Sequence, residues 1–282
     1  MSPPAGVAHC SHSCSLAFGN MSRPALLSIL PGKLRQAAYF KHYHTRHASW
    51  RHLFARAPLA LCPEIAMYDL IPGDVISGCI AFNGFYELEL TNQIVRHAVR
   101  GGTLVDVGAN MGYFSLLWAG LNLSSTVVAF EASPRNVHLL QKNVKQNRLE
   151  DRINVIPKAA GDRAGAINFD AGPPEQTGWG GISTGTLANN ITVPMVRLDE
   201  QLSGTRINVL KIDVEGADTL VLFGCEHLLK DKNIEIIYFE QNRERMEQMG
   251  IADGDARQFL RTMGYETRCI GGDGEGWLAY PA

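Results

Sequence analysis

The middle of the chain shows a pattern of apolar and polar positions that predicts a strand, a tight turn and a helix in succession. Residues 104–107 form a largely apolar run that stops at Gly108. Beyond Gly112, apolar residues recur at helical spacing, and a second apolar run, 126–130, ends at Glu131. This order predicts two parallel strands joined by a crossover helix.

The polar positions in this stretch suit the binding of a nucleoside. Gly108 and Gly112 allow a sharp turn against which a ligand can lie, and the helix that follows directs free N–H groups toward it. Glu131 stands at a strand end, where a carboxylate can accept hydrogen bonds from both ribose hydroxyls. The turn lacks the G-x-G-x-x-G pattern of dinucleotide sites, and Asp106 would repel a pyrophosphate. Asp106, Gly108, Asn110 and Gly112 instead favour the positively charged S-adenosylmethionine.

Later apolar runs predict the rest of an α/β sheet. A third strand at 153–157 leads to Ala159 and Ala160, whose small side chains would leave room for adenine. Ile167–Phe169 and Ile191–Val196 predict an extra strand pair. The connection between them, residues 171–190, is long and rich in Gly, Pro, Ser and Thr, so it is either a substrate loop using Trp179 or an excursion without function.

Two further strands bring carboxylates to the same edge of the sheet. The run 207–212 delivers Asp213 and Glu215, and the run 234–239 ends at Glu240. We interpret Asp213 as the first candidate for a general base, followed by Glu215 and Glu240. Alternatively, Asp213 and Glu240 are ligands of a divalent ion such as Mg²⁺, or the carboxylates are contacts of the cofactor. A further alternative is that Asp213 and Glu215 only stabilise the start of the helix that follows.

The N-terminal part differs in composition from everything after it. Residues 1–63 hold no Asp or Glu but contain seven Lys or Arg and six of the nine His. We expect a basic leader and helix over residues 1–64 and one catalytic domain over residues 65–282. Residues 33–57 predict a helix, residues 65–90 predict small strands with turns at the Pro-Gly and Asn-Gly pairs, and a helix follows at 89–100.

The leader also holds His9, Cys10, His12 and Cys14, which are four possible zinc ligands spaced closely together. A Ser-rich segment without a metal is the other interpretation of this tract.

Composition excludes some classes of partner and location. A net charge of −2 and a pI near 6.5 provide no basic field for nucleic acid. No apolar run reaches the ~18 residues of a membrane span, and no apolar segment typical of a secretory signal is present. Six scattered cysteines favour reduced thiols, and we therefore expect a cytoplasmic protein.

Three motifs, V-D-V-G-A-N-x-G-Y-F, F-E-A-S-P-x-N and L-K-I-D-V-E-G-A-D, resemble the FkbM family of S-adenosylmethionine-dependent methyltransferases over roughly residues 68–240. The resemblance implies a class I methyltransferase fold: a Rossmann-like, mostly parallel seven-stranded sheet with helices on both faces and an antiparallel C-terminal hairpin. It also implies O-methylation of a hydroxyl on a sugar, glycan, polyketide or related small metabolite. The cofactor-binding residues that it implies, beyond those derived above, are Tyr113, Phe114, Ala132, Ser133, Asn136 and Asp213.

Two other functions stay open from the sequence. A methyltransferase acting on nitrogen in nucleic acid usually carries a D/N-P-P-Y/F box after the fourth strand, where this chain has Asp213-Val-Glu-Gly. A non-catalytic module that binds S-adenosylmethionine and regulates a partner would need the same crevice. Release of S-adenosylhomocysteine with a genuine acceptor distinguishes an enzyme from such a module.

Overall fold

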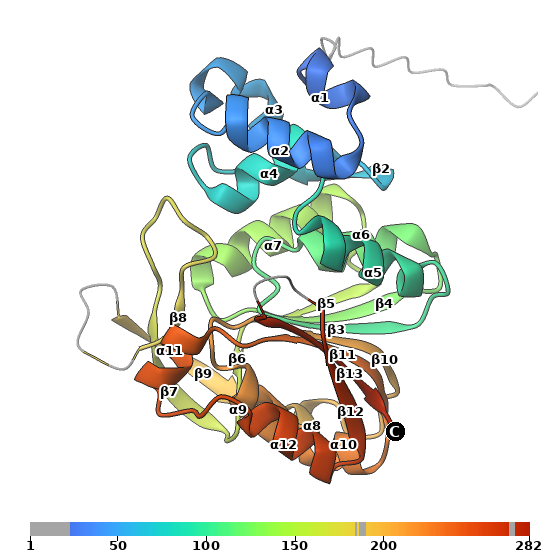
Figure 1. Cartoon of the computed structure of the whole chain (residues 1–282), viewed down its shortest axis with the longest axis vertical. Helices are drawn as coiled ribbons and strands as arrows, with labels where there is room; N and C mark the ends of the chain where they lie inside the picture. The colour runs from blue at the N-terminus through green and yellow to red at the C-terminus, as the bar shows by residue number, and fades with distance from the viewer. Residues whose placement is uncertain (1–22, 184, 186–189, 271–273) are drawn as a thin grey trace, which may run out of the picture.

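A computed structural model describes residues 23–183, 185, 190–270 and 274–282. Its centre is a seven-stranded sheet in which β13 runs in the direction opposite to the other six strands (Figure 1). In spatial order the strands are β12 (Tyr265–Cys269), β13 (Gly276–Pro281), β11 (Ile234–Glu240), β10 (Ile207–Ile212), β3 (Thr103–Val107), β4 (Thr126–Phe130) and β5 (Ile153–Ile156). This is the class I methyltransferase fold, and the prediction of a mostly parallel sheet with an antiparallel C-terminal hairpin is confirmed.

The order of the strands places a crevice at the sheet's centre. The chain moves from β3 to β4 and β5 and then returns to the other side of β3 with β10. The crossovers therefore diverge between β3 and β10, and ligands of open α/β sheets bind beside the carboxyl ends of strands at such a point.

Helices cover both faces of the sheet and enclose two apolar clusters (Figure 1). One face carries α5 (Leu88–Ala98), α6 (Tyr113–Leu121) and α7 (Pro134–Gln146). The other carries α8 (Leu198–Gln201), α9 (Asp218–Phe223), α10 (Glu226–Lys230) and α12 (Asp255–Thr262), and α11 (Arg243–Gln248) follows β11. The central strands are apolar on both sides because both of their faces are buried.

A smaller sheet extends from the end of β5 and stands beside the crevice. In spatial order it contains β6 (Ala159–Ala160), β9 (Asn190–Val196), β7 (Gly165–Asp170) and β8 (Gly181–Ile182). The predicted strand pair is confirmed, because β7 and β9 are antiparallel and Ile167 lies opposite Val193.

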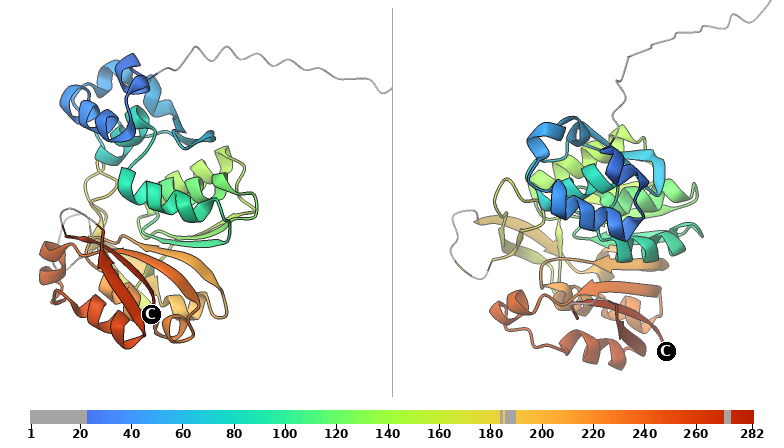
Figure 2. Two further views of the ribbon diagram at one scale, coloured as in Figure 1. Left: turned by 45° about the vertical axis from the view of Figure 1, so that its right-hand side comes forward. Right: turned by 45° about the horizontal axis from the view of Figure 1, so that its top comes forward.

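The N-terminal elements lie over the layer formed by α5, α6 and α7 (Figure 2). They are α1 (Ala25–Ile29), α2 (Gly32–His42), the 3-10 helix η1 (His47–Trp50), α3 (His52–Ala55), β1 (Arg56–Leu59), β2 (Cys62–Tyr68) and α4 (Val75–Asn83). None of the helices in the described part of the chain is long and apolar enough to cross a membrane. The candidate zinc ligands between His9 and Cys14 lie outside the described residues.

The expectation of one helix over residues 33–57 is wrong, because the chain turns after His42. The rings of Tyr39, His47 and Trp50 all lie against Phe82, at centroid distances of 5.3, 5.7 and 6.2 Å. A helix rises 1.5 Å per residue, so a continuous helix would separate Tyr39 and Trp50 by roughly 16 Å. Burial of the three rings on one partner therefore favours a folded-back chain.

The expectation of small strands over residues 65–90 is correct only for its start. Residues 65–68 belong to β2, but the next element is the helix α4, which is followed by the helix α5. Asp74 caps α4 by accepting a hydrogen bond from the N–H of Ser77 at 2.7 Å, and Gly84 ends it with φ = 80°. The Asn-Gly pair is thus a helix end and not a hairpin turn.

The hairpin β1–β2 joins the N-terminal part to the catalytic domain. The side chain of Asn147 bonds both the N–H and the carbonyl of Ala66, and Asn143 accepts from the N–H of Tyr68 at 2.7 Å. Because this hairpin extends across residue 64, the two parts pack together at the predicted boundary; the division into 1–64 and 65–282 stays a prediction.

Candidate active site

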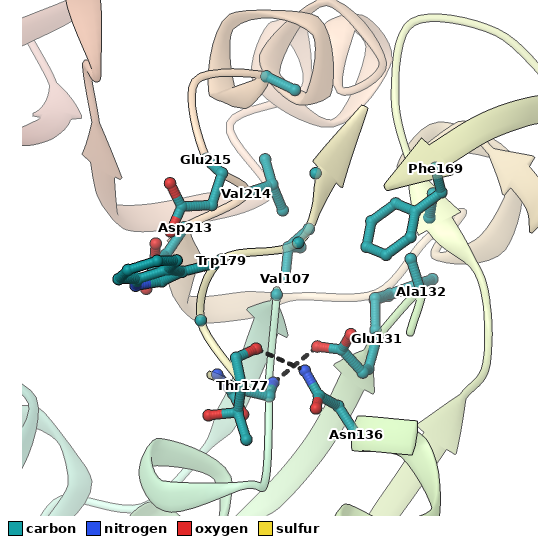
Figure 3. A pocket seen from close by; sticks show the side chains of 18 of the residues that line it. Val107, Glu131, Ala132, Asn136, Phe169, Thr177, Trp179, Asp213, Val214 and Glu215 are labelled. Atoms are coloured by element: carbon teal, nitrogen blue, oxygen red, sulfur yellow. Dashed lines mark hydrogen bonds between the residues drawn. The ribbon is translucent and has the colours of Figure 1, made fainter. Parts of the chain in front are cut away.

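A cavity of about 300 Å³ opens at the carboxyl ends of β3, β4 and β10. The small sheet lines one side, and so does the segment 171–182, which we call the strap, through residues 176–182; Thr177 and Trp179 of the strap are labelled in Figure 3. Eight of the predicted cofactor-binding residues line it: Gly108, Asn110, Glu131, Ala132, Asn136, Ala159, Ala160 and Asp213. The other five, Asp106, Gly112, Tyr113, Phe114 and Ser133, do not line it.

The glycines of the turn after β3 allow close approach between parts of the protein. A Cβ on Gly108, whose φ is 76°, would lie 1.9 Å from the carbonyl oxygen of Asp213. A Cβ on Gly112 would lie 2.4 Å from a methyl group of Leu140. Gly108 thus lets the ends of β3 and β10 meet, and Gly112 lets α6 start against α7.

Asp106 lies beneath the turn and is fully buried. Its carboxylate accepts a 2.7 Å hydrogen bond from the hydroxyl of Ser115 and lies 3.6 Å from the ammonium of Lys211. Asp106 therefore connects β3 to Ser115 of α6 and to Lys211 of β10. Its expected contact with the cofactor stays a prediction.

Glu131 is held in a fixed position at the end of β4. The N–H groups of Asn110 and Ser133 each donate to one of its carboxylate oxygens at 2.8 Å (Figure 3). Burial raises the pKa of Glu131, and these N–H bonds lower it again in part. Since each carboxylate oxygen has two lone pairs, both oxygens keep acceptor capacity for a ligand.

Two side-chain amides of the cavity have oxygens without a partner. The Oδ1 atoms of Asn110 and Asn136 are buried and accept no hydrogen bond from the described residues. The amide nitrogen of Asn136 donates to the carbonyl of Thr177 at 2.9 Å, which fixes which way its oxygen faces (Figure 3). Buried acceptors of this kind are costly unless a ligand or water donates to them.

Small and apolar side chains form the side of the cavity beyond Glu131. Ala132 and Phe169 of β7 line this side of the cavity (Figure 3), and Ala159, Ile167 of β7 and Ile182 of β8 also line it. We call this side the slot; that residues 159 and 160 leave room for an adenine ring stays a prediction.

Hydrogen bonds tie the strap down on three sides. Thr177 donates its N–H to Asp74 at 2.9 Å, and its hydroxyl lies 3.2 Å from both carboxylate oxygens of Asp74. Arg135 of α7 donates to the carbonyl of Gln176 at 2.9 Å. Arg245 of α11 donates to the carbonyl of Trp179 at 3.1 Å. Trp179 lines the cavity with its side chain 56% exposed, as a stacking surface would be.

The three predicted catalytic acids lie together on the opposite side from Glu131. Asp213, Glu215 and Glu240 all line the cavity. Burial and the charge of Asp213 raise the pKa of Glu215 to about 7, although Arg245 lowers it. Burial, followed by the charges of Asp213 and its neighbours, raises the pKa of Glu240 well above its usual range.

Lys211 is the main residue of the site that the sequence interpretation missed. It is 2% exposed, and its ammonium lies 3.2 Å from Asp213 and 3.6 Å from Asp106. Burial lowers its pKa, but Asp213 and Asp106 raise it by more, so Lys211 stays charged. The signal was a lysine within the apolar strand 207–212, since such a lysine is seldom buried without a carboxylate partner.

Backbone strain marks three further positions at the cavity. Glu87, Asn110 and Glu215 line it with φ values of 41°, 51° and 55°, in the left-handed region. Non-glycine residues held there cluster at ligand sites, where the surrounding structure maintains them. Asp74 and Thr177 were also missed, because their contact spans 103 residues.

A metal site is not evident around the acids. No group of three or more His, Cys, Asp or Glu side chains arranged to hold an ion occurs among the described residues. Mg²⁺ bound by Asp213 and Glu240 therefore stays a prediction.

Residues 106–267, more than half of the chain, match the model of the methyltransferase FkbM domain. The chain belongs to the FkbM methyltransferase family. It is 25% identical over 154 residues to the hexuronic acid methyltransferase AglP of Haloferax volcanii, which covers 54% of this chain and 61% of that protein. The chain thus spans less than two thirds of that relative's length.

Solved structures of related fold include a methyltransferase FkbM from Methylobacillus flagellatus, with 14% identity and a TM-score of 0.46 over 83% of this chain and 59% of that one. Another is a putative caffeoyl-CoA O-methyltransferase from Staphylococcus aureus, with 11% identity and a TM-score of 0.42 over 69% and 82% of the two chains.

Proposed function

We propose that the protein transfers a methyl group from S-adenosylmethionine to a hydroxyl oxygen of a small, sugar-like acceptor. The observation that carries the proposal is the charge of the cavity. Its lining contains six carboxylates and one lysine: Asp74, Glu87, Glu131, Asp213, Glu215 and Glu240 against Lys158. Such a lining attracts a ligand with ammonium and sulfonium charges and repels a pyrophosphate.

The individual groups of the cavity fit this cofactor. Glu131 suits the ribose hydroxyls, because its carboxylate is held by two N–H bonds and has acceptor capacity left. The slot between Ala132 and Phe169 suits the adenine ring. The unpartnered Oδ1 atoms of Asn110 and Asn136 suit N–H or O–H donors of the ligand.

The cofactor, when bound, supplies an already activated methyl group, so the protein must mainly orient the acceptor and remove its proton. Asp213 is the proposed base: its carboxylate lines the cavity and is 30% exposed, so a hydroxyl can reach it. The acceptor hydroxyl would give its proton to an Asp213 oxygen while the hydroxyl oxygen takes up the methyl group, and the donor would leave as S-adenosylhomocysteine. Lys211 orients Asp213 from below.

Glu215 contributes negative charge to the cavity in this proposal when it is ionised, at a pH above about 7. Glu240 is a weaker candidate for the base than Asp213, because a carboxyl with a strongly raised pKa holds its own proton near neutral pH.

The acceptor class is supported by the printed name of the relative, a hexuronic acid methyltransferase. The exposed Trp179 is an aromatic surface of the kind on which a sugar face can stack.

Calorimetry tests the cofactor and a labelled methyl donor tests the reaction. We expect S-adenosylhomocysteine to bind and NAD to give no heat. Incubation of the protein with a labelled methyl donor and a pool of small metabolites, followed by mass spectrometry, identifies the acceptor. Tight binding of NAD without binding of S-adenosylhomocysteine would contradict the proposal.

A further inference from the structure

A second cavity of about 700 Å³ adjoins the first and shares the side chains of Glu87, Asp213 and Glu240 with it. We call it the outer basin. We propose that the outer basin is the acceptor site and that it selects acceptors carrying an anionic group, a carboxylate or a phosphate, besides the hydroxyl. This inference rests on the proposed function, because it takes the shared carboxylates as the place where the hydroxyl reacts.

Three cationic side chains from different elements converge on the basin. Lys33 of α2, Arg96 of α5 and Arg268 of β12 all line it, and all three residues are exposed. Among the described residues none of them has a carboxylate within ion-pair distance, whereas Arg197, Arg206 and Arg245 elsewhere do. Their charges are therefore available to a ligand.

Tyr238 lines the basin together with the two arginines. Burial raises the pKa of this phenol to about 12, and Arg268 and Arg96 both oppose the increase. Trp277 of β13 provides a second aromatic side chain. Two guanidinium groups in a cavity with aromatic side chains provide donors for a carboxylate or phosphate on a ring-shaped molecule.

The charges of the basin are arranged in a way that orients such a ligand. The end shared with the first cavity carries Glu87, Asp213 and Glu240. Lys211 also lines the basin there, but its ammonium is buried and paired with Asp213, so the carboxylates of Glu87 and Asp213 still disfavour an anion at this end. The cationic side chains lie on elements outside the shared end, with one acid, Glu89, beside them. An acceptor with a negative group and a hydroxyl would thus bind with the anion at the arginines and the hydroxyl toward Asp213. A neutral acceptor would gain no affinity from attraction to the charges of the arginines.

Saturation-transfer NMR on the protein saturated with S-adenosylhomocysteine tests this selection. The probes are D-glucuronate, D-glucose 6-phosphate and D-glucose, which share a ring and differ in the anionic group. The variant Arg96→Gln/Arg268→Gln removes the two charges and keeps much of the side-chain length. Arg261→Gln is the matched control, because Arg261 is exposed on α12 and lines none of the cavities.

We expect at least one anionic sugar to bind about tenfold more tightly than glucose, and this advantage to disappear in the double variant but not in Arg261→Gln. The anion that binds better tells whether the arginines suit a carboxylate or a phosphate. Equal binding of all three probes, or an anion preference that survives the double substitution, overturns the inference. If S-adenosylhomocysteine does not bind at all, the proposed function fails instead, so the two failures are distinguishable.

Discussion

Glu131, at the end of β4, accepts two backbone N–H bonds of 2.8 Å, whereas Glu215, after β10, and Glu240, the last residue of β11, lie near other carboxylates. One half of the crevice therefore holds its acid by fixed dipoles. The other half concentrates acidic groups, and Lys211 and Arg245 form ion pairs with two of them. The first arrangement suits the binding of a neutral ribose. The second suits the attraction of a cation and the removal of a proton, and substitutions in the two halves should have different effects.

The largest effect is expected for Asp213→Asn. A general base contributes about 10² to 10⁴-fold in rate, so turnover should fall by that factor while the affinity for S-adenosylhomocysteine stays within about twofold. Steady-state kinetics with the identified acceptor and calorimetry measure the two quantities. If EDTA also abolishes the wild-type rate and Mg²⁺ restores it, Asp213 acts as a metal ligand.

Asp231→Asn, an exposed surface change, is the control for this variant. Wild-type turnover in Asp213→Asn would remove Asp213 from the mechanism.

The next largest effect is expected for Glu131→Ala, in the half that binds. The variant loses the acceptor for the ribose and leaves the N–H groups of Asn110 and Ser133 without their partner. Charge-assisted hydrogen bonds contribute roughly 1.5 to 3 kcal/mol, so cofactor affinity should fall at least about tenfold. Calorimetry with S-adenosylhomocysteine measures this, with the exposed Glu150→Ala as control. Unchanged affinity in a folded Glu131→Ala protein would place the ribose elsewhere.

A smaller effect is expected for Thr177→Val, which changes the strap that spans the two halves. The substitution keeps the shape of the side chain and removes the hydroxyl that donates to Asp74. The N–H bond from residue 177 persists, so we expect release of S-adenosylhomocysteine to accelerate only about fivefold. Stopped-flow fluorescence measures this rate, and Thr192→Val, on the exposed side of β9, is the control. An unchanged release rate would mean that this hydroxyl does not hold the strap.

The smallest effect is expected for the pH dependence of the affinity for S-adenosylmethionine relative to S-adenosylhomocysteine, which depends on Glu215. The pKa of Glu215 is raised to about 7, so this carboxyl loses its proton as the pH increases from 6 to 8. The added negative charge favours the sulfonium of S-adenosylmethionine over the uncharged sulfur of S-adenosylhomocysteine. Their affinity ratio should shift toward the sulfonium by about threefold over this range. In Glu215→Gln the ratio should stay flat; an equal shift in that variant would assign the titration to another group.

Local signals were enough to predict the centre of the fold. The apolar runs around Gly108 and Glu131 predicted β3, α6 and β4, because each of these elements is determined by neighbours in the chain. The strand ends at Asp213 and Glu240 followed from the rule that parallel strands present their carboxyl ends at one edge.

Contacts between distant residues were beyond reach of the sequence. The fold of the N-terminal part depends on Phe82, whose ring contacts rings from three earlier segments: Tyr39 of α2, His47 and Trp50 of η1, and Phe54 of α3. The strap depends on Asp74, which lies 103 residues before Thr177. Helix α4 was missed although Asp74 and Gly84 are ordinary helix start and stop signals, because the Asn-Gly pair was interpreted as a hairpin turn.

The amides of Asn143 and Asn147 also protect the protein from self-association. A two-stranded sheet exposes unpaired N–H and carbonyl groups along its outer edge, and another chain can add a strand there and begin aggregation. Along β2 the N–H groups of Ala66 and Tyr68 and the carbonyl of Ala66 are occupied by the side chains of Asn143, in α7, and Asn147, directly after it. Because these backbone groups are already bonded, this segment of β2 is not free to pair with a strand of a second copy.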